Sequence, residues 1–346
     1  MRFGIIGTGM IAQFHAKAIQ ALDDCTLVGV CGSNQLKAQA FGENYGCEGY
    51  GSIEDLCSSD VDIVTIATPS GMHLKHCRTV ASHGKHIICE KPLEITPQRV
   101  EQMIEICSSH GVVLSGIFNR RFNLAVTYLK QAIDDGRFGK LSLCDAYVKW
   151  YRTQAYYDSG GWRGTTEIDG GGALMNQGIH TIDLLQYLAG PIKRLSGSVA
   201  CVSHERIDVE DTAVAILEYA SGARGVIEGS TSSWSKNGHA AEIQISGSQG
   251  SVFLKDDKFS TWEFEHETAL DEQIRTELGY AQGTGLGAND PGAINYDGHI
   301  ANFKDAVKAI RDNRTPAVSG QEGLKSVKII DAIYRSAEQN GAWINL

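Results

Sequence analysis

The first 120 residues alternate short apolar runs with helix-like stretches, and this rhythm constrains the fold more than any other feature of the chain. The apolar runs lie at 2–6, 26–31, 62–67, 86–89 and 112–117. The stretches with helical spacing between them lie at 10–21, 35–45, 73–83 and 97–110. Such alternation is typical of βαβ units around a parallel sheet. The sequence therefore predicts an α/β domain at residues 1–120.

The rhythm changes after residue 119. A helix is predicted at 124–134 and an apolar helix at 173–188, whereas 194–265 contains successive period-2 runs separated by Ser-Gly, Asn-Gly and Gln-Gly turns. That pattern predicts an open, predominantly antiparallel sheet with one polar face. Two helices follow at 298–311 and 320–338. We expect residues 121–346 to form an α+β domain whose C-terminal helices can pack back on the first domain.

Composition narrows the function classes. The 346 residues suggest about two domains, and 42% apolar with 21% charged residues excludes disorder as the main state. A formal charge of −10 argues against a nucleic-acid partner while leaving room for one small anion pocket. No run reaches the roughly 18 apolar residues of a membrane span, so we expect no membrane association.

The nine cysteines are an odd number without a Cys-x-x-Cys pair. Several lie within apolar runs, namely Cys25, Cys31, Cys89, Cys107 and Cys201. Free thiols that behave as small buried hydrophobic residues fit a reducing compartment. We therefore expect a cytoplasmic protein.

The strongest local motif directly follows the first predicted strand and opens a helix. It consists of Gly7, Thr8, Gly9, Met10, Ile11 and Ala12. Gly7 permits a tight turn, Gly9 lets the backbone approach a pyrophosphate, and Ala12 lets the helix sit close to the sheet. The free N–H groups of the helix N-terminus would face the phosphates. The motif predicts a Rossmann dinucleotide-binding domain that takes NAD or NADP.

The end of the second strand bears on the choice of cofactor. A carboxylate there would bind the ribose 2′-hydroxyl, but the chain has Ser33 and Asn34, with Lys37 nearby. The missing acid removes repulsion against a 2′-phosphate and gives a slight lean toward NADP. The alternative is that these residues only cap the following helix.

The third strand ends in Thr68-Pro69, followed by His73, at the carboxyl edge where ligands bind in such folds, so these residues join the predicted cofactor site. His73, His76 and Cys77 could be mistaken for metal ligands, as could His83 and His86. The sequence lacks a clustered carboxylate and histidine set, and solvent-exposed helix positions account for these histidines. We expect no metal.

Lys91 follows Glu90 at the end of the fourth strand, at the same edge. A lysine there can donate a hydrogen bond to a substrate oxygen and favour an alkoxide-like transition state. Taken alone, an ordinary surface lysine would be the simpler interpretation.

In the second domain, Asn176, His180 and Asp183 stand at i, i+4 and i+7 of the predicted apolar helix, and hence on one face. A polar stripe on an apolar helix is costly unless it is satisfied or used. His180 is the natural acid/base.

With the residues 7–12 motif, Ala67–Ser70, Cys89–Pro92 and the Gly170–His180 segment in this order, the chain resembles the Gfo/Idh/MocA family of sugar and cyclitol dehydrogenases over essentially its whole length. The resemblance implies that Lys91 is the catalytic lysine and His180 the acid/base. It places the nicotinamide between Glu90-Lys91 and Trp162-Arg163. It also implies a homo-oligomer, dimer or tetramer, through the C-terminal sheet.

One departure concerns the position four residues before the histidine, where many members carry aspartate and this chain has Asn176. Members that act on nucleotide-linked amino-sugar uronates look similar here, including the stretch around Tyr157. Arg163, and either Arg120 or Arg121 beside Asn119, could pair with a carboxylate or phosphate. Asn176, Arg163, Tyr157, Asn119 and Arg120 are accordingly the predicted substrate-binding residues.

These observations predict an NAD(P)-dependent dehydrogenase that acts on a secondary alcohol or ketone of a sugar, sugar acid or cyclitol. Two alternatives remain at this point. One is a redox-neutral, glycosidase-like sugar-processing enzyme with a tightly bound nicotinamide, and the other is a non-catalytic NAD(P)-binding sensor.

Overall fold

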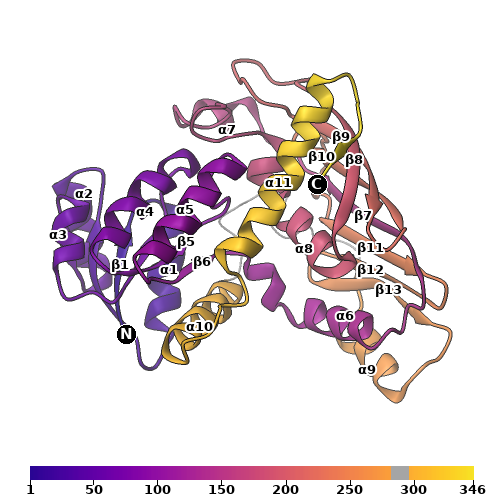
Figure 1. The fold of residues 1–346 in the computed structure, drawn as a ribbon, viewed down its shortest axis with the longest axis horizontal. Helices are drawn as coiled ribbons and strands as arrows, with labels where there is room; N and C mark the ends of the chain where they lie inside the picture. Colours follow the sequence, from indigo (N-terminus) through magenta and orange to yellow (C-terminus); the bar gives the residue numbers. More distant parts are fainter. Residues whose placement is uncertain (282–295) are drawn as a thin grey trace. The chain divides into compact units, whose positions relative to one another are not determined.

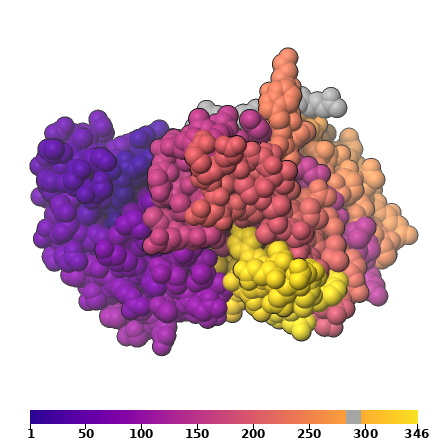
Figure 2. Space-filling view, turned by 90° about the horizontal axis from the view of Figure 1, so that it is seen from above, coloured from indigo at the N-terminus to yellow at the C-terminus, as the bar shows by residue number. Residues whose placement is uncertain are grey.

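The computed structural model describes residues 1–281 and 296–346, which fall into two compact units. The first unit contains Met1–Asn119 and, from the C-terminal part of the chain, residues 296–324. The second contains the described residues between Arg120 and Ala281 together with Lys325–Leu346. Most of the first unit is coloured indigo to purple in Figures 1 and 2.

The first unit is built on a six-stranded sheet with the order β3-β2-β1-β4-β5-β6, in which every neighbouring pair is parallel (Figure 1). Its strands are β1 (Arg2–Ile6), β2 (Thr26–Cys31), β3 (Glu48–Tyr50), β4 (Ile63–Ile66), β5 (His86–Cys89) and β6 (Leu114–Gly116). This is the strand order of a doubly wound dinucleotide-binding domain.

The helices of the first unit are α1 (Met10–Gln20), α2 (Gln35–Tyr45), α3 (Ile53–Ser58), α4 (His73–Ser82), α5 (Pro97–Ser109) and α10 (Asp297–Arg311). One core cluster packs α1, α2 and α10 against the central strands through residues such as Ile19, Phe41 and Phe303. The chain thus returns at α10 to the domain it began with. The short elements β3 and α3 lie outside the predicted rhythm.

The second unit is built on an eight-stranded sheet with the order β13-β12-β11-β7-β10-β9-β8-β14 (Figure 1). The pair β10 and β7 is parallel and all other neighbours are antiparallel. The strands are β7 (Leu141–Lys149), β8 (Ile192–Ala200), β9 (Thr212–Tyr219), β10 (Arg224–Ser230), β11 (Glu242–Gly247), β12 (Gly250–Lys255), β13 (Lys258–Phe264) and β14 (Ile344–Asn345). The predicted fold class is confirmed for both parts of the chain.

The helices of the second unit are α6 (Leu124–Asp134), α7 (Gln154–Asp158), α8 (Ile179–Ala189) and α9 (Ala269–Leu278), and α11 (Gly320–Glu338) begins in the first unit and ends in the second. Helix α8 packs on one face of the sheet, against β7 and β11. On β9 burial alternates, so that Leu217 is buried while Val214 and Ile216 are each 48% exposed. The sheet therefore has one covered and one open face, with apolar side chains on the open one.

All nine cysteines are free, and Cys31, Cys89 and Cys107 are buried as predicted. The prediction is wrong for Cys201, which is exposed because it follows the last residue of β8. Cys25 is half-buried. Within the described ranges, none of the helices has the length and apolar character that a membrane crossing requires.

Candidate functional site

The turn after β1 has the geometry that the glycine motif predicts. Gly7 has φ +119°, and a Cβ there would lie 2.4 Å from the carbonyl oxygen of Ala67, so only glycine fits. Gly9 is the N-cap of α1, and a Cβ built on it meets no atom within 4 Å. Ala12 is fully buried against the sheet. Thr8, Met10 and Ile11 complete the turn, and the first N–H groups of α1 have no side-chain cap.

At the end of β2, Ser33, Asn34 and Lys37 are all exposed. Asn34 caps α2, because its Oδ1 accepts a hydrogen bond of 2.9 Å from the backbone N–H of Lys37. The capping interpretation thus describes Asn34. The side chain of Lys37 remains at the surface.

The ends of β4 and β5 are joined by a buried histidine. His73 is fully buried, with Nε2 2.8 Å from the carbonyl oxygen of Thr68 and Nδ1 3.0 Å from that of Pro92. Solvent exposure is therefore the wrong explanation for His73, and also for His76, where burial lowers the pKa to about 4. Both point inward because α4 packs against α5 and the sheet. The Oγ1 of Thr68 is buried, and no other described residue supplies it with a hydrogen-bond partner.

Glu90 lies inside the first unit, next to the half-buried Lys91. Its Oε1 is 2.9 Å from His15 Nε2 and 3.6 Å from His299 Nε2. Its Oε2 accepts a hydrogen bond of 3.1 Å from the backbone N–H of Lys91. Burial favours the neutral acid, but the hydrogen bond with His15 and the nearby imidazole of His299 hold the pKa of Glu90 well below its usual range. The contact between Glu90 and a dinucleotide stays a prediction.

His15, Glu90 and His299 are the one group in the described part of the chain whose ligand-type atoms are close enough to hold a metal ion, within 4.8 Å of one another. Hydrogen bonding already explains this group. The 2.9 Å separation is that of a hydrogen bond, and Thr65 Oγ1 lies 2.8 Å from the other ring nitrogen of His15.

In the second unit, the segment that carries Asn176 and His180 departs from the predicted helix. Residues Ala173–Gly178 form a π-helical turn, and the α-helix begins only at Ile179. The shared polar face of Asn176, His180 and Asp183 stays a prediction, but the prediction of one continuous α-helix is therefore wrong. Glu210 is the physical reason, because its carboxylate accepts the N–H groups of Gly172 and Leu174 at 2.9 and 2.8 Å and fixes the start of the turn. π-helical turns are frequent at functional sites.

Asp183 has a separate structural use. It is fully buried and holds Arg121 through two hydrogen bonds, of 2.7 Å from Nε and 2.6 Å from Nη2. Arg121 also lies over the ring of Tyr187. The ion pair links the 3₁₀ turn Asn119–Phe122, before α6, to α8 and so anchors the helix that carries His180.

Sequence reasoning missed a polar chain that contacts Asn176. The buried Asp169 accepts a hydrogen bond of 2.5 Å from Asn176 Nδ2, and Asn176 Oδ1 accepts one of 2.6 Å from Gln177. Gln177 Oε1 in turn accepts a hydrogen bond of 2.7 Å from the guanidinium group of Arg152, which lies over the ring of Trp150. Asp169 directly precedes the glycines at 170–172, and this acid beside a glycine run was the available signal.

Aromatic rings surround Arg163. Its guanidinium carbon lies 4.9 Å from the ring centres of both Tyr156 and Trp162, and Nη1 donates to Ser159 at 2.9 Å. Nε is buried and makes no hydrogen bond with the described residues. Tyr157 instead points inward, with its hydroxyl 2.9 Å from Thr231 Oγ1, and burial raises its pKa. A substrate contact by Tyr157 stays a prediction, with Tyr156 the more accessible neighbour.

Asn119 and Arg120 open a short 3₁₀ turn, Asn119–Phe122. Asn119 Nδ2 lies 3.3 Å from His299 Nδ1, and Arg120 lies 6.0 Å from the ring centre of Trp150. Their predicted roles toward substrate are not tested by these contacts.

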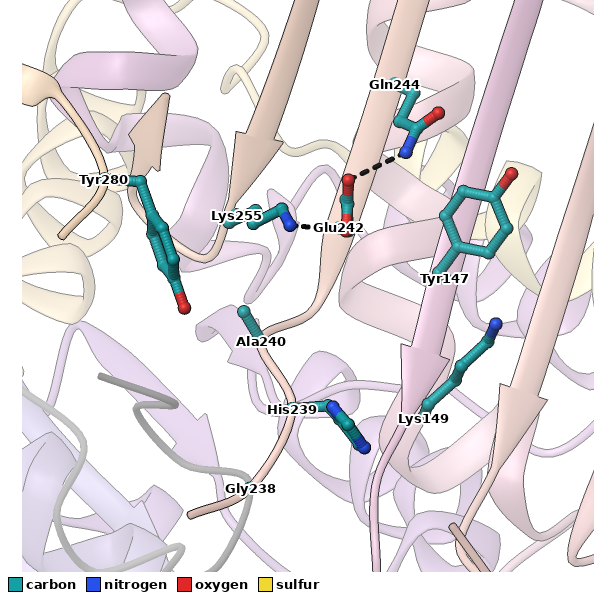
Figure 3. A pocket seen from close by; sticks show the side chains of 9 residues that line it. All are labelled: Tyr147, Lys149, Gly238, His239, Ala240, Glu242, Gln244, Lys255 and Tyr280. Carbon is teal, nitrogen blue, oxygen red and sulfur yellow. Dashed lines mark hydrogen bonds and ion pairs between the residues drawn. The ribbon is translucent and has the colours of Figure 1, made fainter. Parts of the chain in front are cut away.

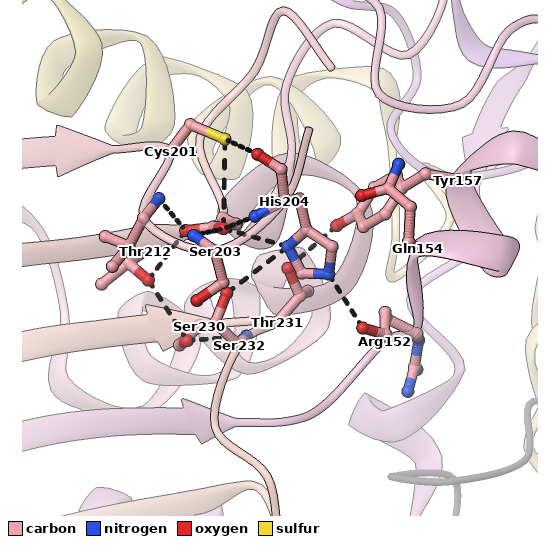
Figure 4. Close-up of polar contacts among 12 residues, drawn as sticks. Arg152, Gln154, Tyr157, Cys201, Ser203, His204, Thr212, Ser230, Thr231 and Ser232 are labelled. Carbon is pink, nitrogen blue, oxygen red and sulfur yellow. Dashed lines mark hydrogen bonds and ion pairs between the residues drawn. The ribbon is translucent and has the colours of Figure 1, made fainter. Parts of the chain in front are cut away.

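A second polar cluster contacts the backbone carbonyl group of Arg152 (Figure 4). Asp211 accepts hydrogen bonds from the backbone N–H groups of Val202, Ser203 and His204. The ring of His204 lies between Asp211 Oδ2, at 2.9 Å, and the carbonyl oxygen of Arg152, at 2.8 Å. The ring of His204, with an acceptor on each side, holds the loop of residues 201–204 against the backbone at Arg152, three residues after β7.

A hollow of about 300 Å³ lies elsewhere in the second unit, between the ends of β7, β11 and β12 (Figure 3). Its charged groups are paired, Lys149 with Glu228 at 2.8 Å and Lys255 with Glu242 at 3.4 Å. None of the predicted site residues lines it.

The structure thus places the predicted cofactor residues of the first unit at the carboxyl ends of β1, β2, β4 and β5. In the second unit, Gln177 of the Asn176 network donates a hydrogen bond to Tyr156, whose ring lies beside Arg163. An NAD-binding oxidoreductase is the class of protein that this fold and these motifs define. Residues 1–118 match the family model described as "Oxidoreductase family, NAD-binding Rossmann fold", and residues 126–253 match the GFO/IDH/MocA C-terminal domain. The chain belongs to the GFO/IDH/MocA family.

Two solved structures and one further relative show the extent of the likeness. The WlbA dehydrogenase from Bordetella pertussis, in complex with NADH and UDP-GlcNAcA, is 32% identical, with a TM-score of 0.88 over 100% of this chain and 98% of that chain. WlbA from Chromobacterium violaceum, with the same two ligands, is 32% identical, with a TM-score of 0.89 over 100% and 96%. An inositol 2-dehydrogenase of Rhizobium meliloti (strain 1021) is 28% identical over 345 residues, which are 98% of this chain and 97% of the relative.

Proposed function

We propose that this protein is an NAD(P)-dependent oxidoreductase that interconverts a secondary alcohol and a ketone on a sugar, sugar acid or cyclitol. The observation that carries the proposal is the glycine turn after β1 together with Lys91 after β5. Both lie at the carboxyl ends of parallel strands of one sheet, where a dinucleotide and its reaction partner bind in such folds. The dehydrogenase relatives that span the whole chain support it.

The residues of the first unit fit a dinucleotide. Gly9 leaves open the space that a side chain would fill, and the first N–H groups of α1 are available to a pyrophosphate. The buried Oγ1 of Thr68 offers a further polar contact. When bound, the nicotinamide supplies the hydride acceptor or donor for the reaction.

Lys91 and His180 carry the proposed proton chemistry. The ammonium group of Lys91 would donate a hydrogen bond to the reacting oxygen and favour its alkoxide character. The imidazole of His180 would take the hydroxyl proton in the oxidation and return it in the reduction. Asn176 would orient a substrate hydroxyl, with its own amide held by Asp169.

We further propose a nucleotide-linked sugar uronate as the substrate. Arg163 between Tyr156 and Trp162 presents a planar cation that suits a carboxylate or a diphosphate. The relatives solved with UDP-GlcNAcA, at 32% identity over the full chain, support this choice.

Three finer points complete the proposal. The missing acid after β2 leaves NADP acceptable, with a slight lean toward it. The open face of the eight-stranded sheet, with Val214 and Ile216 exposed, would form a homo-oligomer interface. Nine free thiols fit a reducing, cytoplasmic environment.

The test is an assay of UDP-GlcNAcA, inositols and free sugars with NAD and with NADP, read as reduced nicotinamide and as keto product by mass spectrometry. We expect turnover with the nucleotide-linked uronate, and a fall of about 10³-fold in kcat for Lys91→Met and for His180→Ala. Lys75→Met, at an exposed lysine of α4, is the matched control.

Wild-type turnover in both active-site variants would overturn the mechanism. Transformation of the sugar without net reduced nicotinamide would instead identify a redox-neutral enzyme. Dinucleotide binding without any transformation of the substrate panel would favour a sensor.

A further inference from the structure

Three buried side chains from distant parts of the sequence meet behind Lys91, and no step of the proposed reaction uses them. They are His15 on α1, Glu90 after β5 and His299 on α10. His15 is fully buried, and Glu90 and His299 are each only 6% exposed. Ionisable groups are rarely buried together unless they are paired, so we expect these three side chains to interact with one another.

The proton positions follow from the partners of His15. Burial lowers its pKa, so the ring is neutral, while Glu90 is ionised and can only accept hydrogen bonds. His15 Nε2 therefore carries the proton and donates to Glu90 Oε1 at 2.9 Å. Nδ1 is then the acceptor, and the hydroxyl of Thr65 donates to it at 2.8 Å. Thr65 on β4 and His15 on α1 thus fix one oxygen of the carboxylate.

His299 approaches the same oxygen from the other side. Its Nε2 lies 3.6 Å from Glu90 Oε1, and its ring stacks on Phe14 at a centroid distance of 5.9 Å. The amide of Asn119 lies against Nδ1, while Asn119 Oδ1 is buried and has no hydrogen-bond partner in the described part of the chain. Reversing this amide would place Oδ1 against a protonated Nδ1.

The second oxygen of Glu90 connects the cluster to the reaction. Oε2 accepts the backbone N–H of Lys91 at 3.1 Å. A carboxylate whose Oε1 is hydrogen-bonded to His15 and flanked by His299 is thereby a well-positioned acceptor for the main chain of the next residue. We propose that His15, Glu90 and His299 form a positioning cluster that holds the main chain at Lys91 and so sets where its ammonium group stands. The functional part of this proposal rests on the proposed role of Lys91 in hydride transfer.

The variant His299→Leu removes one partner of the carboxylate, and His299→Gln keeps an N–H donor at a similar distance from the main chain. His110→Leu, at an exposed histidine after α5, is the matched control. Thr65→Val is a second, nearly isosteric change that removes the donor to His15. It keeps the proposal testable if His299→Leu fails to fold.

Two measurements need no substrate. The first is amide hydrogen exchange in the peptide that contains Lys91, and the second is the rate at which acetic anhydride acetylates Lys91, read by mass spectrometry with and without NADH. We expect amide exchange at least tenfold faster in His299→Leu and about threefold faster in Thr65→Val. We expect the amide exchange rate of His299→Gln to lie within about threefold of the wild-type rate, and that of His110→Leu to equal it.

The third measurement uses the substrate that the assay proposed above selects. The cluster predicts a fall of at least tenfold in kcat for His299→Leu, partial recovery in His299→Gln, and a KM for the dinucleotide within about twofold. If no substrate turns over, the exchange and acetylation rates still decide the positioning proposal, and only the proposed function fails. Unchanged exchange in both His299→Leu and Thr65→Val would overturn the cluster. The proposal would also be overturned if the purified wild-type protein contained one equivalent of zinc or iron and the His299→Leu variant contained none.

Discussion

Two glycine-rich loops, residues 7–9 in the first unit and residues 170–172 in the second, contain glycines with opposite surroundings. In the first unit, a Cβ added to Gly9 would meet nothing within 4 Å. In the second unit, a Cβ added to Gly172 would lie 1.8 Å from the carbonyl oxygen of Glu210, and one added to Gly171 would lie 2.2 Å from the hydroxyl of Tyr334. The space at Gly9 is open beside a helix N-terminus, whereas the space at Gly171 and Gly172 is filled by the protein's own chain.

The difference separates two reasons for a glycine. At Gly9 the missing side chain leaves room for a ligand. At Gly172 it lets the backbone at Glu210, just before β9, lie directly against the π-helical turn. Glu210 completes the second arrangement, because it accepts the N–H of Gly172 and of Leu174 and also the hydroxyl of Tyr334 at 3.0 Å. A substitution at Gly172 should therefore lower the free energy of unfolding, whereas one at Gly9 should weaken the binding of a dinucleotide.

The largest effect is expected from Gly172→Ala. The new methyl group would collide with backbone that cannot move without breaking the hydrogen bonds to Glu210, so we expect a loss of about 3 kcal/mol in the free energy of unfolding. Urea denaturation measures it. Gly161→Ala in the same region, where a Cβ meets nothing within 4 Å, is the control and should change stability by less than about 0.5 kcal/mol. Equal free energies of unfolding for Gly172→Ala and Gly161→Ala would contradict the close packing at Gly172, and with it the contrast to Gly9.

The polar support of the second unit predicts the next effect. Asp211 is fully buried, and although burial raises its pKa, hydrogen bonds from the backbone of Val202, Ser203 and His204 hold that pKa well below its usual range. Asp211→Asn should lose about 2–3 kcal/mol at pH 7, since the amide places a donor against these N–H groups.

The pH dependence has a definite sign. A carboxyl group with a lowered pKa in the folded state stabilises the fold above the pKa of the unfolded chain, and this contribution is lost as the pH falls through the folded value. The difference between wild type and Asp211→Asn should therefore be full at pH 6 and smaller at pH 3. A difference that is equal at both pH values would contradict the role of the carboxylate charge.

The same contrast explains how far the sequence could lead. The turn at Gly7 and Gly9 was predictable because strand, turn and helix are adjacent in the chain and each leaves a local pattern. The π-helical turn was not, because it depends on Glu210 and Tyr334, which lie far along the chain from Gly172. Short-range patterns likewise gave no sign that His73 would be buried between two carbonyl oxygens, since that requires two loops to meet in space.

The polar partners of the predicted residues were missed for the same reason. Asp169 lies within a few residues of Asn176 in sequence, but their contact depends on the loop between them folding back. His299 contacts Glu90 only because α10 returns to the first unit. The strand β3 (Glu48–Tyr50) escaped detection because its three residues, Glu-Gly-Tyr, contain no apolar run.

For the open loop, Gly9→Ala should weaken dinucleotide binding without weakening the fold. Its φ of −79° and ψ of −174° suit alanine, so the free energy of unfolding should stay within about 0.5 kcal/mol. The methyl group would occupy the space proposed for the pyrophosphate, and we expect the Kd for NADH to rise about tenfold or more by fluorescence titration. Gln13→Ala, at an exposed position of α1, should leave the Kd unchanged. A loss of stability in place of affinity would make Gly9 the counterpart of Gly172.

The smallest effect concerns which dinucleotide the residues after β2 favour. Lys37 is exposed and only its backbone N–H is used by Asn34, so its ammonium group would reach a 2′-phosphate but have no partner on a 2′-hydroxyl. Lys37→Ala should raise the Kd for NADPH about threefold to fivefold and that for NADH less than twofold, and 0.5 M salt should shrink the difference because exposed charge pairs are screened. Lys75→Ala controls for the loss of a surface charge. Equal Kd changes for the two dinucleotides would leave the empty acid position after β2 without a role in selecting NADP, and would make capping of α2 a sufficient explanation for the residues there.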